Sequence, residues 1–234
     1  MSELILVRHG QASFGQDNYD KLSEQGCQQV TCLAKHWEKL GDRFDAIYSG
    51  TLQRQQETAE ILLPNIADQI THIHPGLNEY NADALLNIYW RDHAANDGMA
   101  QERASVRNDR KAFQRTLEKT CERWIKGKLE ANDSDTTFES WRTYRYRVMS
   151  ALEEIMQTHT SGSRVVLSTS GGVIAVALQR ALSLPDEQVI ACNWMIHNSS
   201  VTRLVYSGSR VSMGTFNNLA HLDTPQLRSL ITFR

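Results

Sequence analysis

The chain has 234 residues, a length that suits one large domain or a domain carrying an insertion rather than two full domains. Hydrophobic residues make up 41% and charged residues 22%, an ordinary globular composition that excludes wholesale disorder. With 25 Lys and Arg against 27 Asp and Glu, the formal net charge is -2, so no global basic field attracts nucleic acid or an anionic membrane. No apolar run approaches the ~20 residues that span a bilayer.

The amino terminus and the cysteines favour a cytoplasmic protein. The start Met-Ser-Glu-Leu lacks the basic residues of a secretory signal, so no leader is expected. The four cysteines form no CxxC pair and no metal-ligand spacing, which predicts reduced thiols. An ordinary cytoplasmic enzyme or binding domain remains.

Predicted strands and helices alternate along the first third of the sequence. In order they are a buried strand at 4–7, a helix from the capping Ser23 to Gly41, a strand at 45–49, a helix at 53–63 and a weaker strand at 70–77. Such alternation favours a parallel sheet covered by helices on both faces.

The alternation lapses from Asn81 to about Asn132 and then returns. Apolar residues between 106 and 129 predict one long amphipathic helix ending near Gly127. The later elements are predicted as a helix over 138–155, a strand at 164–169, a helix at 173–182 and closing strands at 200–206 and 211–216. The sequence therefore predicts a single domain over 1–234: a three-layer α/β/α sandwich around a mostly parallel sheet, with a helical insertion at 80–132.

Residues with useful chemistry follow the first two strands, at the sheet edge where ligands bind in open parallel sheets. Arg8, His9 and Gly10 come directly after the first strand. An imidazole there can act as a base, a metal ligand or a nucleophile, or can simply be hydrogen-bonded at the strand end. Arg54 lies in the first turn of the next helix, where a guanidinium and the helix N–H donors can bind a phosphoryl group.

Two further segments belong to the same edge. Glu79 follows the third strand and places a carboxyl group nearby. Ser170, Gly171 and Gly172 form a small turn that opens a helix, which suits an oxyanion. Each segment alone can be a solvated charge or a tight turn. Because all four are predicted at the same sheet edge, together they favour an anion-binding site. His72 and His74 share a strand face without a third partner, so no metal site is predicted.

These segments resemble the histidine phosphatase superfamily, also called phosphoglycerate mutase-like. The matching segments are 4–10, 48–54 with Glu57, Thr58 and Ala59, 77–79, 165–172 and 198–202. The resemblance implies that His9 is the nucleophile, carrying the phosphoryl group as phosphohistidine, while Arg8 and Arg54 bind its oxygens. It also implies that Glu79 acts as the general acid and then as the base. Two guanidinium groups suit the charge of a phosphoryl group in transfer, so no metal or cofactor is expected.

Ser170 departs from the family pattern, which has a second histidine before the paired glycines. A protonated histidine gives the phosphoryl group a charge-assisted hydrogen bond, whereas serine gives a neutral one. The difference is about 1–2 kcal/mol, or roughly ten- to thirtyfold in rate. Ser170 and Gly171 are expected to bind the phosphate, and the activity is expected to be low.

The favoured function is a metal-independent phosphatase acting on a small phosphomonoester. The first alternative is a catalytically weakened phospho-ligand binding or adaptor protein, which the serine would fit. The second is a phosphoglycerate-type mutase. It is disfavoured because mutases of the family carry Arg, then His or Tyr, then Gly after the acid, where this chain has Tyr80, Asn81 and Ala82. The expected partner is a small phosphorylated substrate, without nucleic acid or membrane, and a homo-oligomer is allowed.

The loop after the predicted nucleophile and the insertion are expected to contribute specificity. Gln11, Ser13 and Asn18 are predicted as substrate contacts. The insertion begins directly after the predicted acid, so it is expected to form a lid over the site. Residues 101–130 hold nine basic and five acidic residues, a local +4 interpreted first as a solvated helical face. His221 is interpreted as structural.

Overall fold

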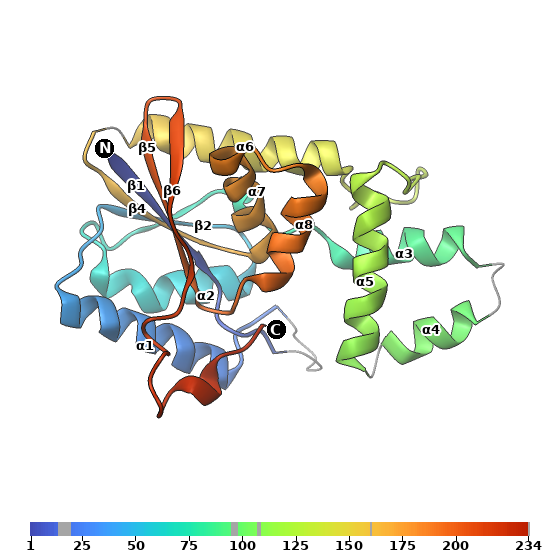
Figure 1. The fold of residues 1–234 in the computed structure, drawn as a ribbon, viewed down its shortest axis with the longest axis horizontal. Coiled ribbons are helices and arrows are strands. Elements are labelled where there is room, and N and C mark those ends of the chain that lie inside the picture. Colours follow the sequence, from blue (N-terminus) through green and yellow to red (C-terminus); the bar gives the residue numbers. More distant parts are fainter. Residues whose placement is uncertain (14–19, 95–97, 107–108, 160, 234) are drawn as a thin grey trace. The chain divides into compact units, whose positions relative to one another are not determined.

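The computed structural model describes residues 1–13, 20–94, 98–106, 109–159 and 161–233, and these residues form six strands and eight helices (Figure 1). The strands are β1 (Ser2–Arg8), β2 (Ala46–Ser49), β3 (Thr71–Ile73), β4 (Arg164–Thr169), β5 (Val201–Ser207) and β6 (Arg210–Asn218). The helices are α1 (Glu24–Leu40), α2 (Gln53–Leu62), α3 (Ala82–Asp92), α4 (Met99–Val106), α5 (Arg110–Ile125), α6 (Trp141–Thr158), α7 (Gly171–Leu182) and α8 (Asp186–Met195).

The chain divides into two compact units, one of Met1–Glu79 with Val148–Arg234 and the other of Tyr80–Arg147. The second unit starts where the sequence predicts the insertion, but it extends beyond residue 132. The reason is that Trp141 in the first part of α6 packs on Trp124 of α5, with ring centroids 5.1 Å apart. The lid stays a prediction.

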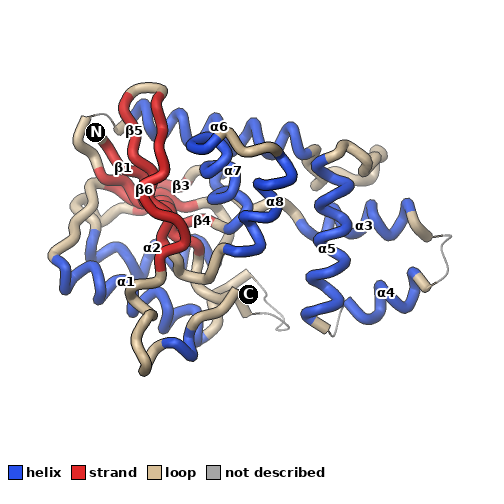
Figure 2. The backbone as a smooth tube through the Cα atoms, in the orientation of Figure 1, coloured by secondary structure: helices blue, strands red, loops and turns tan. Residues whose placement is uncertain are grey.

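The six strands form one sheet in the order β3-β2-β4-β1-β5-β6 (Figure 2). β1, β2, β3 and β4 run parallel, whereas β5 pairs antiparallel with β1 and β6 pairs antiparallel with β5. Thr169 at the end of β4 pairs with Arg8, and Ser168 pairs with Ser49. The segments that follow β1, β2 and β4 therefore emerge side by side at one edge of the sheet.

Helices cover both faces of this sheet. α1 and α2 lie on one face, where Leu33, Trp37 and Leu62 pack with strand residues such as Ile5 and Ile47. The alternate side chains of β1 and β4 are also buried, on the face that carries α7 (Figure 1). α7 is apolar, and its residues from Gly171 to Gln179 are buried. The result is the predicted three-layer α/β/α sandwich around a mostly parallel sheet.

The predicted boundaries are confirmed where local signals are strong. Ser23 caps α1 by accepting a hydrogen bond from the Gly26 N–H at 3.0 Å, and Gly41 ends the helix in the left-handed region with φ 72°. The predicted strand at 70–77 is shorter than expected, because Pro75 begins a 3₁₀ turn after β3.

One element of the sequence prediction is wrong. The predicted single helix starts wrongly, because Val106 is the last residue of α4 and the apolar residues from 113 to 124 lie on α5, whereas its predicted end near Gly127 is confirmed. Asp109 begins the second helix by accepting a hydrogen bond from the Lys111 N–H at 2.8 Å. Because apolar residues continue at helical spacing across the break, periodicity alone does not reveal it.

Candidate functional site

His9 is anchored through its backbone at the end of β1. Its N–H donates to the Thr169 carbonyl at 2.8 Å, and its carbonyl accepts from the Asn198 side chain and the Ser199 N–H, each at 3.3 Å. The turn at 198–200 is held in turn by His221, whose Nε2 lies 2.8 Å from the Ser199 hydroxyl. The His9 residue is only 6% exposed, so its ring is held in a protein environment rather than in bulk water.

Two neighbours define the protonation state of the His9 ring. Nε of Arg54 lies 3.1 Å from Nε2, and the Gly10 carbonyl lies 2.7 Å from Nδ1. A guanidinium can only donate and a carbonyl can only accept, so the proton is on Nδ1 and the lone pair is on Nε2. Burial, followed by the charges of Arg54 and Arg8, lowers the pKa of His9 well below the ordinary 6.5. The ring is therefore a neutral imidazole with a directed lone pair.

Arg54 lies in the first turn of α2, next to the sheet edge at which β1 ends. Thr58, one turn later, donates to the Arg54 carbonyl at 2.8 Å and accepts from the Gly10 N–H at 3.2 Å. This link joins the turn after β1 to α2. Arg8 is held from the other side, with Nη1 donating to the Ile196 carbonyl.

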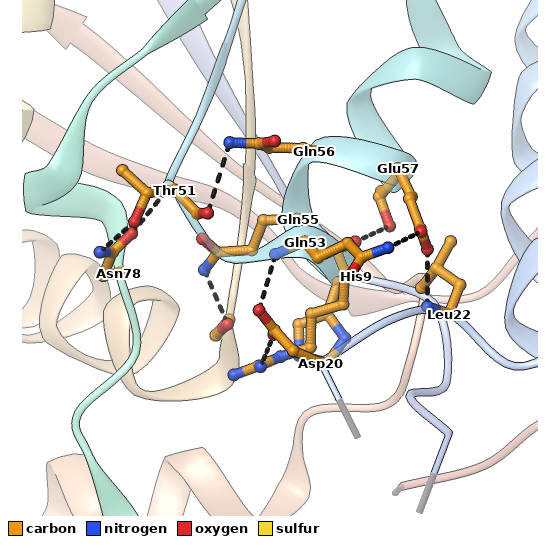
Figure 3. Close-up of polar contacts among 12 residues, drawn as sticks. His9, Asp20, Leu22, Thr51, Gln53, Gln55, Gln56, Glu57 and Asn78 are labelled. Atoms are coloured by element: carbon orange, nitrogen blue, oxygen red, sulfur yellow. Dashed lines mark hydrogen bonds and ion pairs between the residues drawn. The ribbon is translucent and has the colours of Figure 1, made fainter. Parts of the chain in front are cut away.

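Asp20 bonds to the same end of α2 (Figure 3). One carboxylate oxygen forms an ion pair with Nη1 of Arg54, and the other accepts from the Gln53 N–H at 2.9 Å. The carboxylate thus accepts hydrogen bonds from both a guanidinium and a helix N–H, the two kinds of donor that bind an oxyanion. The start of α2 can bind a negatively charged group.

Glu79 and the Ser170 turn meet at the start of α7. The Gly172 N–H donates to Oε2 of Glu79 at 3.0 Å. The Ser170 residue is fully buried, and Oγ accepts a hydrogen bond from Nε2 of Gln55 at 2.8 Å. Gly171 packs so closely on Asn193 that a Cβ there would lie 2.4 Å from Oδ1. The structure thus brings the predicted residues from β1, β2, β3 and β4 to one sheet edge.

The predicted substrate contacts in the loop after β1 have partners within the protein. Gln11 accepts from the Ser23 hydroxyl through Oε1 at 3.1 Å. Ser13 donates to the Leu22 carbonyl at 3.1 Å and is buried. Both contacts tie the loop to the start of α1, and a role toward substrate stays a prediction. Asn18 lies outside the described residues.

The sequence pattern did not single out Gln55 and Asp20. The signal for Gln55 is its place on α2: it shares the buried stripe with Thr58, Ala59 and Leu62, and a buried amide needs partners. No local signal points to Asp20, because its partners lie more than thirty residues away along the chain.

The described residues contain no group of three or more His, Cys, Asp or Glu side chains that could hold a metal ion. His72 pairs with Asp68 at 3.1 Å, and His74 lies 3.3 Å from Glu154. None of the helices in the described part of the chain combines the length and apolarity needed to cross a bilayer.

The sequence matches the family model of the histidine phosphatase superfamily (branch 1) over residues 4–127 and 105–219, and the chain belongs to this superfamily. It is 26% identical over 235 residues to a metal-independent phosphoserine phosphatase of Arabidopsis thaliana, covering 96% of this chain and 84% of that protein. It is also 26% identical over 211 residues to a 2,3-bisphosphoglycerate-dependent phosphoglycerate mutase of Hamiltonella defensa, covering 82% of each.

Solved structures share the fold. Phosphoserine phosphatase from Entamoeba histolytica, in complex with phosphoserine, matches with a TM-score of 0.65 and 18% identity, covering 95% of this chain and 100% of that one. A mycobacterial glucosyl-3-phosphoglycerate phosphatase matches with a TM-score of 0.58 and 22% identity, covering 92% and 98%.

Proposed function

We propose that the protein is a phosphatase that hydrolyses a small phosphomonoester through a phosphohistidine on His9. The observation that carries the proposal is the neutral imidazole, whose Nε2 lone pair is directed toward Arg54 at 3.1 Å. Because the nucleophilic nitrogen and the guanidinium are adjacent, a phosphoryl group could bond to the first while the second binds its oxygens. The Arabidopsis relative is a metal-independent phosphoserine phosphatase, which supports the same class of reaction.

In the first step, Nε2 of His9 attacks phosphorus while the bond from phosphorus to the ester oxygen breaks. Arg54 turns its N–H from Nε2 to a phosphoryl oxygen, and Arg8 binds another. Glu79, protonated at this stage, gives its proton to the leaving oxygen. The products of this step are an alcohol and phosphohistidine.

In the second step, the Glu79 carboxylate takes a proton from water while the water oxygen attacks phosphorus. The bond from phosphorus to Nε2 breaks and its electron pair returns to the imidazole. Phosphate leaves, His9 is neutral again and Glu79 is again protonated, so the cycle closes. The Gly172 N–H holds the carboxylate through both steps.

Ser170 is proposed to donate a neutral hydrogen bond to the phosphoryl group. Because a charge-assisted bond is stronger, turnover is expected to be roughly ten- to thirtyfold slower than with a protonated imidazole at this position. Gly171 keeps the turn close to Asn193 and leaves backbone N–H donors at the start of α7.

The test is phosphate release from an aryl phosphate in the presence of EDTA, with His9→Ala as the critical variant. His72→Ala, on the exposed sheet edge, is the matched control. We expect wild type and the control to release phosphate alike and His9→Ala to release none above background. Equal turnover by wild type and His9→Ala would refute the phosphatase. Phosphate binding without turnover in wild type would favour a phospho-ligand binding protein instead.

A further inference from the structure

Gln55 is a fully buried amide beside the predicted catalytic residues, and the proposed reaction gives it no role. It follows Arg54 on α2 and lies behind the Ser170 turn. Its backbone carbonyl accepts from the Ser168 hydroxyl at 2.7 Å, which holds the start of α2 against β4. Figure 3 shows the Gln55 side chain extending from the helix, with its own hydrogen bond drawn.

The orientation of the Gln55 amide follows from its partners. Nε2 lies 3.0 Å from the Leu77 carbonyl and 2.8 Å from Oγ of Ser170. The Leu77 carbonyl can only accept, so the atom that faces it must be the nitrogen. Oε1 points to Gly50, where a Cβ would lie 2.0 Å away, and has no hydrogen-bond partner among the described residues. The amide is kept in this orientation at the cost of an unsatisfied carbonyl oxygen.

This orientation decides what the Ser170 hydroxyl can do. Because Nε2 of Gln55 donates to Oγ, the serine oxygen is an acceptor on that side, and its own proton is directed elsewhere. Within the described part of the chain, the Ser170 side chain does not cap α7. A hydroxyl that accepts from the protein and keeps its proton is a donor for an incoming oxyanion.

We propose that Gln55 is a positioning residue that makes the Ser170 hydroxyl a hydrogen-bond donor to the phosphoryl group; the inference rests on the proposed function. The same amide holds the Leu77 carbonyl, two residues before Glu79. Gln55 thereby joins α2, the Ser170 turn and the segment of the proposed acid in one buried network.

The test is a double-mutant cycle of Gln55→Met and Ser170→Ala. Each variant is assayed for kcat and KM with an aryl phosphate, and for the Kd of orthophosphate by calorimetry. Each single variant is expected to lose roughly three- to tenfold in kcat/KM and in phosphate affinity, the value of one neutral hydrogen bond. The double variant is expected to match Ser170→Ala within about twofold, because Gln55 acts through that hydroxyl.

Gln56→Met is the matched control, because among the described residues the Gln56 side chain bonds only to the Thr51 carbonyl, at 3.3 Å. This variant is expected to leave all three measurements unchanged. If Gln55→Met is too unstable to purify, Gln55→Asn is assayed instead, because its shorter side chain keeps an amide that cannot reach both the Leu77 carbonyl and Oγ of Ser170. Losses that multiply in the double variant would overturn the proposal, as would full phosphate affinity in Gln55→Met. The calorimetric arm needs no turnover, so it separates this failure from the failure of the phosphatase itself.

Discussion

Asp20 and Arg54 form an ion pair at the start of α2, with the Gln53 N–H bonded to the second carboxylate oxygen. The Arg54 side chain is 11% exposed and that of Asp20 is 37% exposed, so the pair lies between the interior and solvent. In this arrangement a carboxylate holds donors that the proposed reaction assigns to the phosphoryl group. If the proposed reaction holds, a phosphorylated substrate must compete with Asp20 for Arg54.

Asp20→Asn tests this competition. Removing the charge weakens the contact with Arg54, and we expect orthophosphate to bind about fivefold more tightly, the value of one partly exposed ion pair. The control is Asp42→Asn, which removes a similar pair with Arg164 at the start of β4 and should leave the affinity unchanged. Weaker binding in Asp20→Asn would instead mean that the carboxylate orients the guanidinium productively.

Glu79→Gln should separate the two chemical steps. With an aryl phosphate the leaving group needs little protonation, so His9 is phosphorylated, but the amide cannot activate water and the second step slows by about a hundredfold or more. Stopped-flow measurement should show a burst of about one equivalent of phenol followed by slow turnover. Glu154→Gln, at an exposed carboxylate, should behave as wild type. Wild-type turnover in Glu79→Gln would remove Glu79 from the mechanism.

The pH dependence of stability should report His221. Burial, together with the charge of His36, lowers its pKa to about 3. The native pKa is below the unfolded value of about 6.5, so the stabilisation is present above pH 6.5 and is lost as the pH falls. Wild type should lose about 2 kcal/mol more than His221→Gln between about pH 6.5 and pH 5 in urea titrations. Identical losses would contradict the lowered pKa.

Gly10 should tolerate no side chain. A Cβ on it would lie 2.4 Å from the Gly26 carbonyl oxygen, and both groups are backbone that cannot turn aside. Gly10→Ala is expected to cost about 3 kcal/mol of unfolding free energy and to displace His9. Gly41→Ala, where φ is 72° and no atom lies within 4 Å of the Cβ, should cost only about 1 kcal/mol. Equal costs in urea unfolding would show that the turn after β1 can yield.

The lowered pKa of His9 predicts how kcat/KM depends on pH at acid pH. Burial and the charges of Arg54 and Arg8 disfavour the imidazolium, so the proposed nucleophile is expected to stay neutral below pH 6.5. The acid limb of kcat/KM is expected below that value. An acid limb centred above pH 6.5 would mean that the ring is protonated in the native protein.

The order of the elements and the sheet edge that carries the candidate site could be predicted from the sequence. The apolar run before Arg8 predicted β1, and Ser23 and Gly41 predicted the ends of α1, because these signals act between near neighbours. Arg8, Arg54 and Glu79 could be placed together because parallel strands end at one edge.

The hydrogen-bond partners of these groups could not be predicted, because they depend on how distant segments pack. The proton position on His9 depends on Arg54, 45 residues away, and the role of the Ser170 hydroxyl depends on Gln55, 115 residues away. Local patterns cannot encode such contacts, because a hydrogen bond is specified by the direction of two side chains after folding. The break between α4 and α5 escaped prediction because helical spacing continues across it.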